Sequence, residues 1–285
     1  MPSKLEAGVR TFAGCGAPYD ESEVVLFGAP FDSTTSYRPG ARFASSSIRS
    51  ESIGIETYSP YQMEDIENLK ISDAGDLELP FGNAGRALDV VETFCGKVLD
   101  DGKMPVMIGG EHLLTFGAVR AVAARHPDLR LIHFDAHADL RRDYMGESLS
   151  HATVMRRVWD LLGDGRIYQF GIRSGTREEF DWATAHVRTE LFTVRGIDGC
   201  SEAVSGYPVY ISVDLDVIDP SEFPGTGTPE AGGVSFKDLL DALLCLKGLN
   251  VAGFDICELA PHYDVSGIST ALACKVLREM LIAYY

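Results

Sequence analysis

The sequence predicts an α/β protein built around a parallel β-sheet, and two observations support this prediction. Short apolar runs rich in β-branched residues alternate with longer stretches of helical composition, the order found in sheets that helices cover on both faces. The chain has 285 residues, of which 45% are hydrophobic and 24% charged, as in soluble globular proteins with a large core. No linker-like or repeated segment interrupts the pattern, so we expect one domain over residues 1–285.

The expected strands are apolar runs, several of which end in acidic residues or histidines. They comprise residues 24–31, 70–77, 105–112, 129–137, 166–173, 190–194, 208–217 and 251–259. Helical composition between them predicts helices near residues 84–101, 113–125, 150–162, 176–187, 235–246 and 267–283. Ligands of open parallel sheets bind at the carboxyl ends of the strands, so we expect the functional site there.

Charge, cysteines and the N-terminal segment exclude several classes of function. The formal net charge of −17 would repel nucleic-acid phosphates, whereas it tolerates a small cationic substrate. The six cysteines form no CxxC pair, which favours reduced thiols over disulfides or a structural zinc site. The N-terminal segment has no apolar signal core, and no apolar run approaches the length of a membrane span. We therefore expect a cytoplasmic protein without nucleic-acid or membrane partners.

Acidic residues and histidines gather at the ends of three expected strands, in "GGEH", "FDAHAD" and "DLDVIDP". Residues at alternate positions of a strand point to one face, so the polar groups within each motif converge. The set comprises His112, Asp135, His137, Asp139, Asp214 and Asp216. Four carboxylates and two imidazoles at one sheet edge would repel one another without a cation. Mixed imidazole and carboxylate ligands suit divalent first-row metals, and six of them favour two ions with a bridging hydroxide.

Three further residues beside these motifs are expected to be structural. His133 lies one pleat repeat deeper in the strand than Asp135, so we expect a hydrogen-bonded core histidine. Glu111 precedes His112 and points to the opposite face of the strand, which favours a supporting role. His126 is expected at a helix end.

The motifs resemble the three signature motifs of the ureohydrolases, the family of arginases and agmatinases. The likeness continues in "GAPFDSTTSYRPGARFASSSIR" (28–49), "GTGTPEAGG" (225–233) and "DICELAP" (255–261). It implies a single three-layer α/β/α domain with an arginase-like parallel sheet of about eight strands, two Mn²⁺ ions per subunit, and a homotrimer or homohexamer. It also implies that one ion is held by His112, Asp135, Asp139 and Asp214, and the other by Asp135, His137, Asp214 and Asp216.

The resemblance further implies roles in a hydrolytic reaction. Asp139 would pass a proton to the leaving nitrogen, and His151 would contact the substrate and shuttle protons between the site and solvent. Glu258 would pair with a substrate guanidinium and hold its carbon over the metal-bridging hydroxide. Glu230 would help to orient the substrate, or would lie exposed in its glycine-rich turn. The alternative for His151 is a residue at the start of a helix with no role in the reaction. The alternative for Glu258 is an ordinary surface glutamate.

The position of Arg141 bears on the choice of substrate. Arginases resembling this chain carry an asparagine two residues after the DxHxD motif, where it contacts the substrate α-carboxylate, and here that residue is Arg141. We expect Arg141 to face solvent and the substrate to be agmatine, which has no carboxylate and yields putrescine and urea in polyamine biosynthesis. Two alternatives stay open: another guanidino or formimino compound (guanidinobutyrate, arginine or formiminoglutamate), or a catalytically inactive regulatory relative.

Overall fold

The computed structural model describes residues 11–285, and these form a sheet covered by helices on both faces. The expectation about a signal core concerns residues 1–10 for the most part, which lie outside this range. Within residues 11–285, no helix has both the length and the apolar character needed to cross a membrane.

The sheet has eight strands in the order β4-β1-β5-β10-β9-β6-β7-β8, and every neighbouring pair is parallel. The strands are β1 (Val24–Gly28), β4 (Ile71–Asp76), β5 (Met104–Ile108), β6 (Arg130–Phe134), β7 (Ile167–Ile172), β8 (Arg188–Leu191), β9 (Pro208–Asp214) and β10 (Asn250–Cys257). This confirms the predicted fold class and each predicted strand, although β8 begins two residues earlier than expected. A small antiparallel hairpin, β2 (Tyr58–Ser59) and β3 (Glu64–Asp65), stands apart from the sheet.

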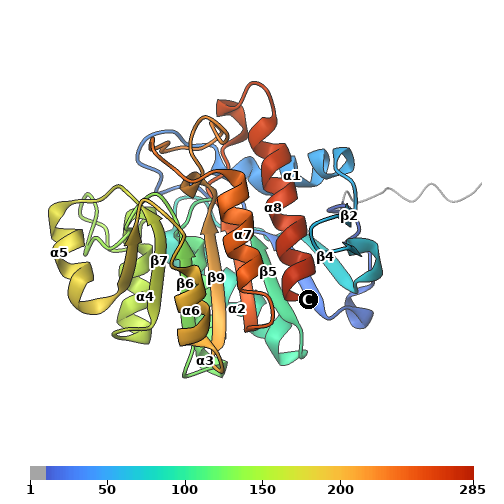
Figure 1. Ribbon diagram of the computed structural model, residues 1–285, viewed down its shortest axis with the longest axis horizontal. Helices are drawn as coiled ribbons and strands as arrows, with labels where there is room; N and C mark the ends of the chain where they lie inside the picture. The colour runs from blue at the N-terminus through green and yellow to red at the C-terminus, as the bar shows by residue number, and fades with distance from the viewer. Residues whose placement is uncertain (1–10) are drawn as a thin grey trace, which may run out of the picture.

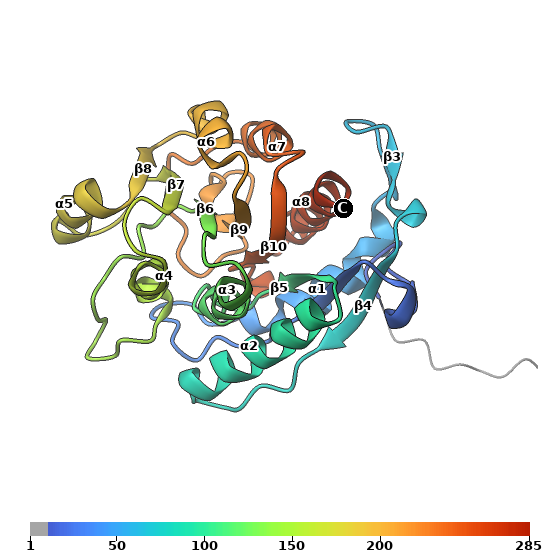
Figure 2. The ribbon, with the colours of Figure 1, turned by 90° about the horizontal axis from the view of Figure 1, so that it is seen from below.

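Helices form a layer on each side of the sheet (Figures 1 and 2). One layer contains α1 (Ala44–Glu51), α6 (Ile197–Val204), α7 (Phe236–Cys245) and α8 (Ile268–Tyr284), whose buried residues share one core. The other contains α2 (Ala84–Asp100), α3 (Leu114–Arg125) and α4 (Val154–Leu162), which share a second core with α5 (Arg177–His186). Short 3₁₀ helices span Tyr19–Glu21, Ala41–Phe43, Ser52–Gly54, Ile66–Asn68, His151–Thr153, Leu215–Val217 and Pro261–Tyr263.

Two helices, α1 and α6, have no counterpart in the sequence prediction. The α1 segment "ASSSIRSE" is rich in serine and its N-terminus has no side-chain cap, so its local helix propensity is low. Tertiary contacts hold it instead: the Arg49 guanidinium is buried and pairs with Asp73 and Asp76 of the edge strand β4. The α6 segment is short and contains Gly199, which weakens a helix further.

Candidate metal centre

The polar motifs lie at the carboxyl ends of four strands that are neighbours in the sheet. These strands are β5, β10, β9 and β6, in that order. His112 follows β5, Glu258 follows β10, Asp214 ends β9 and Asp135 follows β6. These residues are far apart in sequence, and the strand order brings them to one edge. The structure thereby brings together all six expected ligands, and a cavity of about 210 Å³ lies beside His137, Asp139 and Asp214.

The imidazole of His112 is oriented by a hydrogen-bonded chain behind it. Its Nε2 lies 3.0 Å from Ser212 Oγ, and that hydroxyl donates to Asp255 Oδ1 at 2.7 Å. Because Ser212 has given its one hydrogen to Asp255, it accepts from His112 Nε2–H. In the neutral ring, the lone pair is therefore on Nδ1.

The Nδ1 atom of His112 faces three carboxylates. It lies 3.1 Å from Asp135 Oδ2, 3.2 Å from Asp139 Oδ2 and 3.4 Å from Asp214 Oδ2. Despite these short distances, the buried atom has no hydrogen-bond partner among residues 11–285. A lone pair and three carboxylate oxygens directed at one point form a set of electron-pair donors, which a cation can satisfy.

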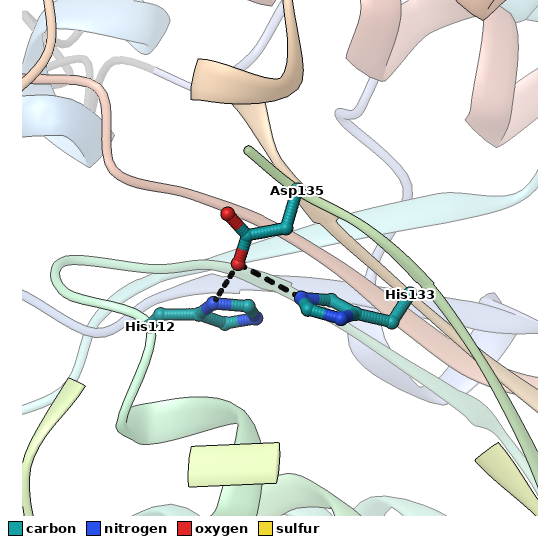
Figure 3. A group of neighbouring side chains, drawn as sticks. All are labelled: His112, His133 and Asp135. Atoms are coloured by element: carbon teal, nitrogen blue, oxygen red, sulfur yellow. Dashed lines mark hydrogen bonds and ion pairs between the residues drawn. The ribbon is translucent and has the colours of Figure 1, made fainter. Parts of the chain in front are cut away.

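Asp135 lies between two imidazoles, with its Oδ2 also 2.9 Å from His133 Nε2 (Figure 3). Gln169 determines the tautomer of His133. Its Nε2 amide donates to His133 Nδ1 at 3.1 Å and to the Ala138 carbonyl at 2.8 Å, while its Oε1 accepts from Thr189. His133 therefore carries its hydrogen on Nε2 and donates it to Asp135, which confirms the predicted hydrogen-bonded core histidine.

A second group of donors forms beside the first. His137 Nδ1 lies 3.1 Å from Asp216 Oδ2 and 3.4 Å from Asp135 Oδ1, so Asp135 contributes one oxygen to each group. Backbone amides hold both carboxylates, since His137 N–H donates to Asp135 Oδ1 at 2.5 Å and Ala136 N–H to Asp216 Oδ1 at 3.1 Å. Two donor groups that share one carboxylate are the arrangement expected for two neighbouring ions.

Ligand atoms close enough to hold an ion also occur in groups that include His133 or Cys257. We do not assign these two residues as ligands. Both ring nitrogens of His133 already have protein partners, and the buried Cys257 thiol lies 3.8 Å from the Val213 carbonyl oxygen. Burial raises the pKa of that thiol well above its ordinary value, so it carries no thiolate at neutral pH.

The ionisation of the carboxyls also favours a bound cation. Burial and the neighbouring Asp135 carboxylate raise the pKa of Asp139 to about 7. Burial and the Asp216 carboxylate raise the pKa of Asp214 well above its ordinary value. Burial opposes ionisation of Asp135, but the close imidazoles of His112, His133 and His137 outweigh it and lower the pKa of Asp135 well below the usual range. Additional positive charge nearby would therefore favour the ionised forms of Asp139 and Asp214 beside Asp135 at neutral pH, and the donor set fits two divalent metal ions.

Two candidate site residues have strained backbone. Asp139 has a φ of 52° and Glu258 a φ of 63°, in the left-handed region that residues with a side chain seldom occupy. Such conformations persist where surrounding contacts enforce them, often at functional sites. Glu258 is held on both sides: its N–H donates to the Gly110 carbonyl at 3.0 Å, and its Oε1 accepts from His112 N–H at 2.7 Å.

Glu258 and His151 line the same cavity as the donor groups. Burial raises the pKa of Glu258 to about 8, so a cation in the cavity would stabilise the ionised form. His151 donates from Nδ1 to the Thr34 carbonyl at 3.0 Å, and its Nε2 lies 3.2 Å from Ser36 Oγ. Burial lowers the pKa of His151 to about 4, which leaves a neutral ring with its lone pair on Nε2.

Glu111 supports His151 through Thr34. Its buried carboxylate accepts from Thr34 N–H at 2.8 Å and from Thr34 Oγ1 at 2.5 Å. Thr34 Oγ1 in turn accepts from the backbone N–H of His151 at 3.1 Å. The expected supporting role of Glu111 therefore has a specific form: it anchors the loop on which His151 rests.

Two expectations about residues near the cavity need correction or refinement. Arg141 does not face only solvent: its side chain lines the cavity beside Asp139. The strand periodicity ends at Phe134, so it could not predict this direction. Glu230 is absent from the cavity lining in the described part of the chain, and its carbonyl accepts hydrogen bonds from Arg173. Arg173 also donates to the carbonyls of Asp216 and Val217, so it ties the Glu230 turn to the ligand turn.

Several residues that orient the candidate ligands were not predicted from the sequence. Gln169, Ser212 and Asp255 lie inside the buried strands β7, β9 and β10, and each is fully buried. A signal for them existed, because a polar residue within a fully apolar strand needs a buried partner. Thr34 and Ser36 gave no such signal, since polar residues in a loop are common.

Comparison with known proteins places the chain among hydrolases of guanidino compounds. The family described as "Arginase family" matches residues 22–283. An agmatinase from Bacillus anthracis is 48% identical over 280 residues, covering 96% of each chain. The crystal structure of an agmatine ureohydrolase from Thermoplasma volcanium superposes with a TM-score of 0.89 at 40% identity, covering 97% of this chain and 94% of that one. A guanidinobutyrase from Pseudomonas aeruginosa is 35% identical, covering 93% of this chain and 87% of its own.

Gly110 in the "GGEH" motif provides a test of this geometry. A Cβ atom added there would lie 1.9 Å from the Phe31 carbonyl oxygen, whereas a Cβ at Gly199 in α6 would meet nothing within 4 Å. We expect Gly110→Ala to lower the free energy of unfolding by about 1–3 kcal/mol through overpacking. The control Gly199→Ala should be neutral or stabilising by up to about 1 kcal/mol. Urea denaturation measures both, and equal stability of the two variants would contradict the close approach at Gly110.

Proposed function

The chain belongs to the arginase family, whose members are hydrolases acting on guanidino amidines with a binuclear metal centre, and we propose that its substrate is agmatine. The products would be putrescine and urea. The observation that carries the proposal is the placement of the buried Glu258 carboxylate in the same small cavity as the two donor groups. That cavity can hold a guanidinium between an anion and the metal centre.

We propose Mn²⁺ at both positions. One ion would be held by His112, Asp135, Asp139 and Asp214, in agreement with the convergence on His112 Nδ1. The other would be held by Asp135, His137, Asp214 and Asp216, three of which lie together in the second group. When bound, such a pair supplies a bridging hydroxide at neutral pH, because divalent ions lower the pKa of bound water towards about 7.

Glu258 binds and orients the substrate in this proposal. Its carboxylate would pair with the guanidinium and fix the central carbon relative to the nucleophile. The hydrogen bond from His112 N–H holds the carboxylate in place before the substrate enters. Burial raises the pKa of Glu258. Because agmatine is a cation, its entry would stabilise the ionised form of that carboxyl.

Proton movement falls to Asp139 and His151. Asp139 is both a ligand and a cavity residue, so its free oxygen could pass the proton of the nucleophile to the leaving nitrogen. The tetrahedral carbon can expel an amine only after that nitrogen is protonated. His151 Nε2, neutral and beside Ser36 Oγ, would accept and release protons between the cavity and solvent.

A second candidate function has an observation of its own. Arg141 lines the cavity and could pair with a carboxylate, which would favour guanidino acids such as 4-guanidinobutyrate. The similarity to a relative named guanidinobutyrase, from Pseudomonas aeruginosa, supports this second candidate. The higher identity to an agmatinase, 48% against 35%, supports agmatine as the first candidate.

The metal assignment predicts unequal losses from two ligand substitutions. Asp214→Ala removes a bridging ligand and should empty both positions, whereas His112→Ala should mainly empty one. Asp128→Ala is the control, because that exposed carboxylate precedes β6 at the opposite end of the strand. Elemental analysis after dialysis gives the ion count, and two ions retained by Asp214→Ala would refute the bridging role.

The proposed role of His151 predicts a loss of turnover without a loss of metal. We expect His151→Asn to lower kcat by up to about 10²–10⁴-fold, the range of general acid–base contributions. Metal content should stay at the wild-type value, because His151 belongs to neither donor group. An unchanged kcat at full metal content would remove His151 from the reaction.

The substrate proposal is tested by urea release from manganese-loaded protein with agmatine, arginine and 4-guanidinobutyrate. Agmatine should have the highest kcat/KM, exceeding arginine by at least about a hundredfold. That ratio requires about 2.7 kcal/mol, less than the cost of leaving a partly buried carboxylate poorly paired. A higher value for 4-guanidinobutyrate would establish the second candidate, and no urea from any of them would favour an inactive relative or a formimino substrate.

A further inference from the structure

An ion pair lines the cavity at the loop that follows the candidate ligand Asp139. Arg141 Nε is 3.4 Å from Glu179 Oε2, and the Arg141 guanidinium carbon is 4.6 Å from the centre of the Tyr144 ring. All three side chains line the cavity. The Arg141 side chain is 35% exposed and that of Glu179 only 4%. The Glu179 carboxylate is therefore buried, whereas the Arg141 guanidinium is partly open to solvent.

The helix start of α5 holds the Glu179 carboxylate in place. Its Oε2 accepts from Thr176 N–H at 2.8 Å and from Thr176 Oγ1 at 3.0 Å, in a capping box. Its Oε1 accepts from Leu140 N–H at 3.1 Å, one residue before Arg141. The carboxylate therefore connects α5 to the loop that carries Arg141, and its position does not depend on a substrate.

The Arg141–Glu179 pair contributes no net charge to the cavity lining. Apart from the Tyr144 phenol, the other charged or titratable groups among the described lining residues are the candidate ligands His137, Asp139 and Asp214, together with Glu258 and His151. Those groups serve the metals and the reacting guanidinium. Arg141 and Glu179 add one positive and one negative charge to the rest of the lining, and these two charges cancel.

We propose that Glu179 is a specificity-determining residue, which neutralises Arg141 and so prevents the cavity from becoming a carboxylate site. This inference rests on the proposed hydrolysis of guanidino compounds. A substrate carboxylate would have to compete with Glu179 for the Arg141 guanidinium. A substrate ammonium meets no net positive charge there, because the Arg141 charge is already balanced. Discrimination between cationic and anionic substrates is then a property of the pair.

The proposal predicts opposite effects from removing each charge. Agmatine and 4-guanidinobutyrate share the guanidinium and differ at the far end, where one has an ammonium and the other a carboxylate. Glu179→Gln should lower the ratio of kcat/KM for agmatine over 4-guanidinobutyrate at least about tenfold, because it frees the Arg141 charge. Arg141→Met should raise the same ratio at least about tenfold, because it leaves the Glu179 charge unbalanced.

A double variant and a matched control separate this electrostatic role from a structural one. Glu179→Gln can weaken the α5 cap, and a purely structural defect would lower kcat/KM for both substrates equally. Arg141→Met with Glu179→Gln removes both charges and should bring the ratio back to within about threefold of the wild type. Glu178→Gln makes the same charge change on the exposed neighbour, outside the cavity, and should not shift the ratio.

The outcome is independent of which substrate the wild-type protein prefers. The order of substrates in the unmodified protein tests the proposed function, and the shifts in the ratio test the pair. Opposite shifts in the two single variants, cancelled in the double variant, would support the proposal. Equal ratios in all variants, or shifts in the same direction for Glu179→Gln and Arg141→Met, would overturn it.

Discussion

The main physical constraint on this protein is the mutual repulsion of four carboxylates that are buried together at the carboxyl ends of β6 and β9. They belong to Asp135, Asp139, Asp214 and Asp216. Within residues 11–285, no lysine or arginine side chain pairs with any of them. The chain thus concentrates negative charge, which the proposed metal ions would compensate. The binding free energy of those ions consequently contributes to folding, as in other proteins whose metal sites exist only in the native state.

The groups behind the ligands determine how the site presents its electron pairs. Ser212 and Asp255 fix the orientation of His112, and Gln169 fixes that of His133 beside Asp135. Outer partners of this kind set ligand basicity and geometry. They lie within the sheet, where backbone hydrogen bonds on both sides restrict movement. The ligands are therefore oriented by the fold itself, and metal binding need not reorganise them.

The sequence predicted those features that depend on hydrophobic periodicity along the chain, namely the strands and the polar residues at their ends. All eight strands follow from apolar runs, and the six candidate ligands follow from the polar residues at the ends of three of these runs, because a strand sends alternate side chains to one face. The direction of Arg141 did not follow, since it depends on Glu179, which is 38 positions later and lies on α5. Helix α1 did not follow either, because contacts of Arg49 with a distant strand, and not local propensity, stabilise it.

The central position of β10 has a consequence for how the protein is made. Before residues 250–257 are synthesised, β5 and β9 have no strand between them, and the sheet exists as two halves, β4-β1-β5 and β9-β6-β7-β8. His112 belongs to the first half and the four carboxylates to the second. Until β10 is present, no strand of the sheet holds His112 beside the four carboxylates, and each half has an open edge to protect from other chains. The complete donor set therefore assembles only after β10 has been synthesised and inserted between β5 and β9.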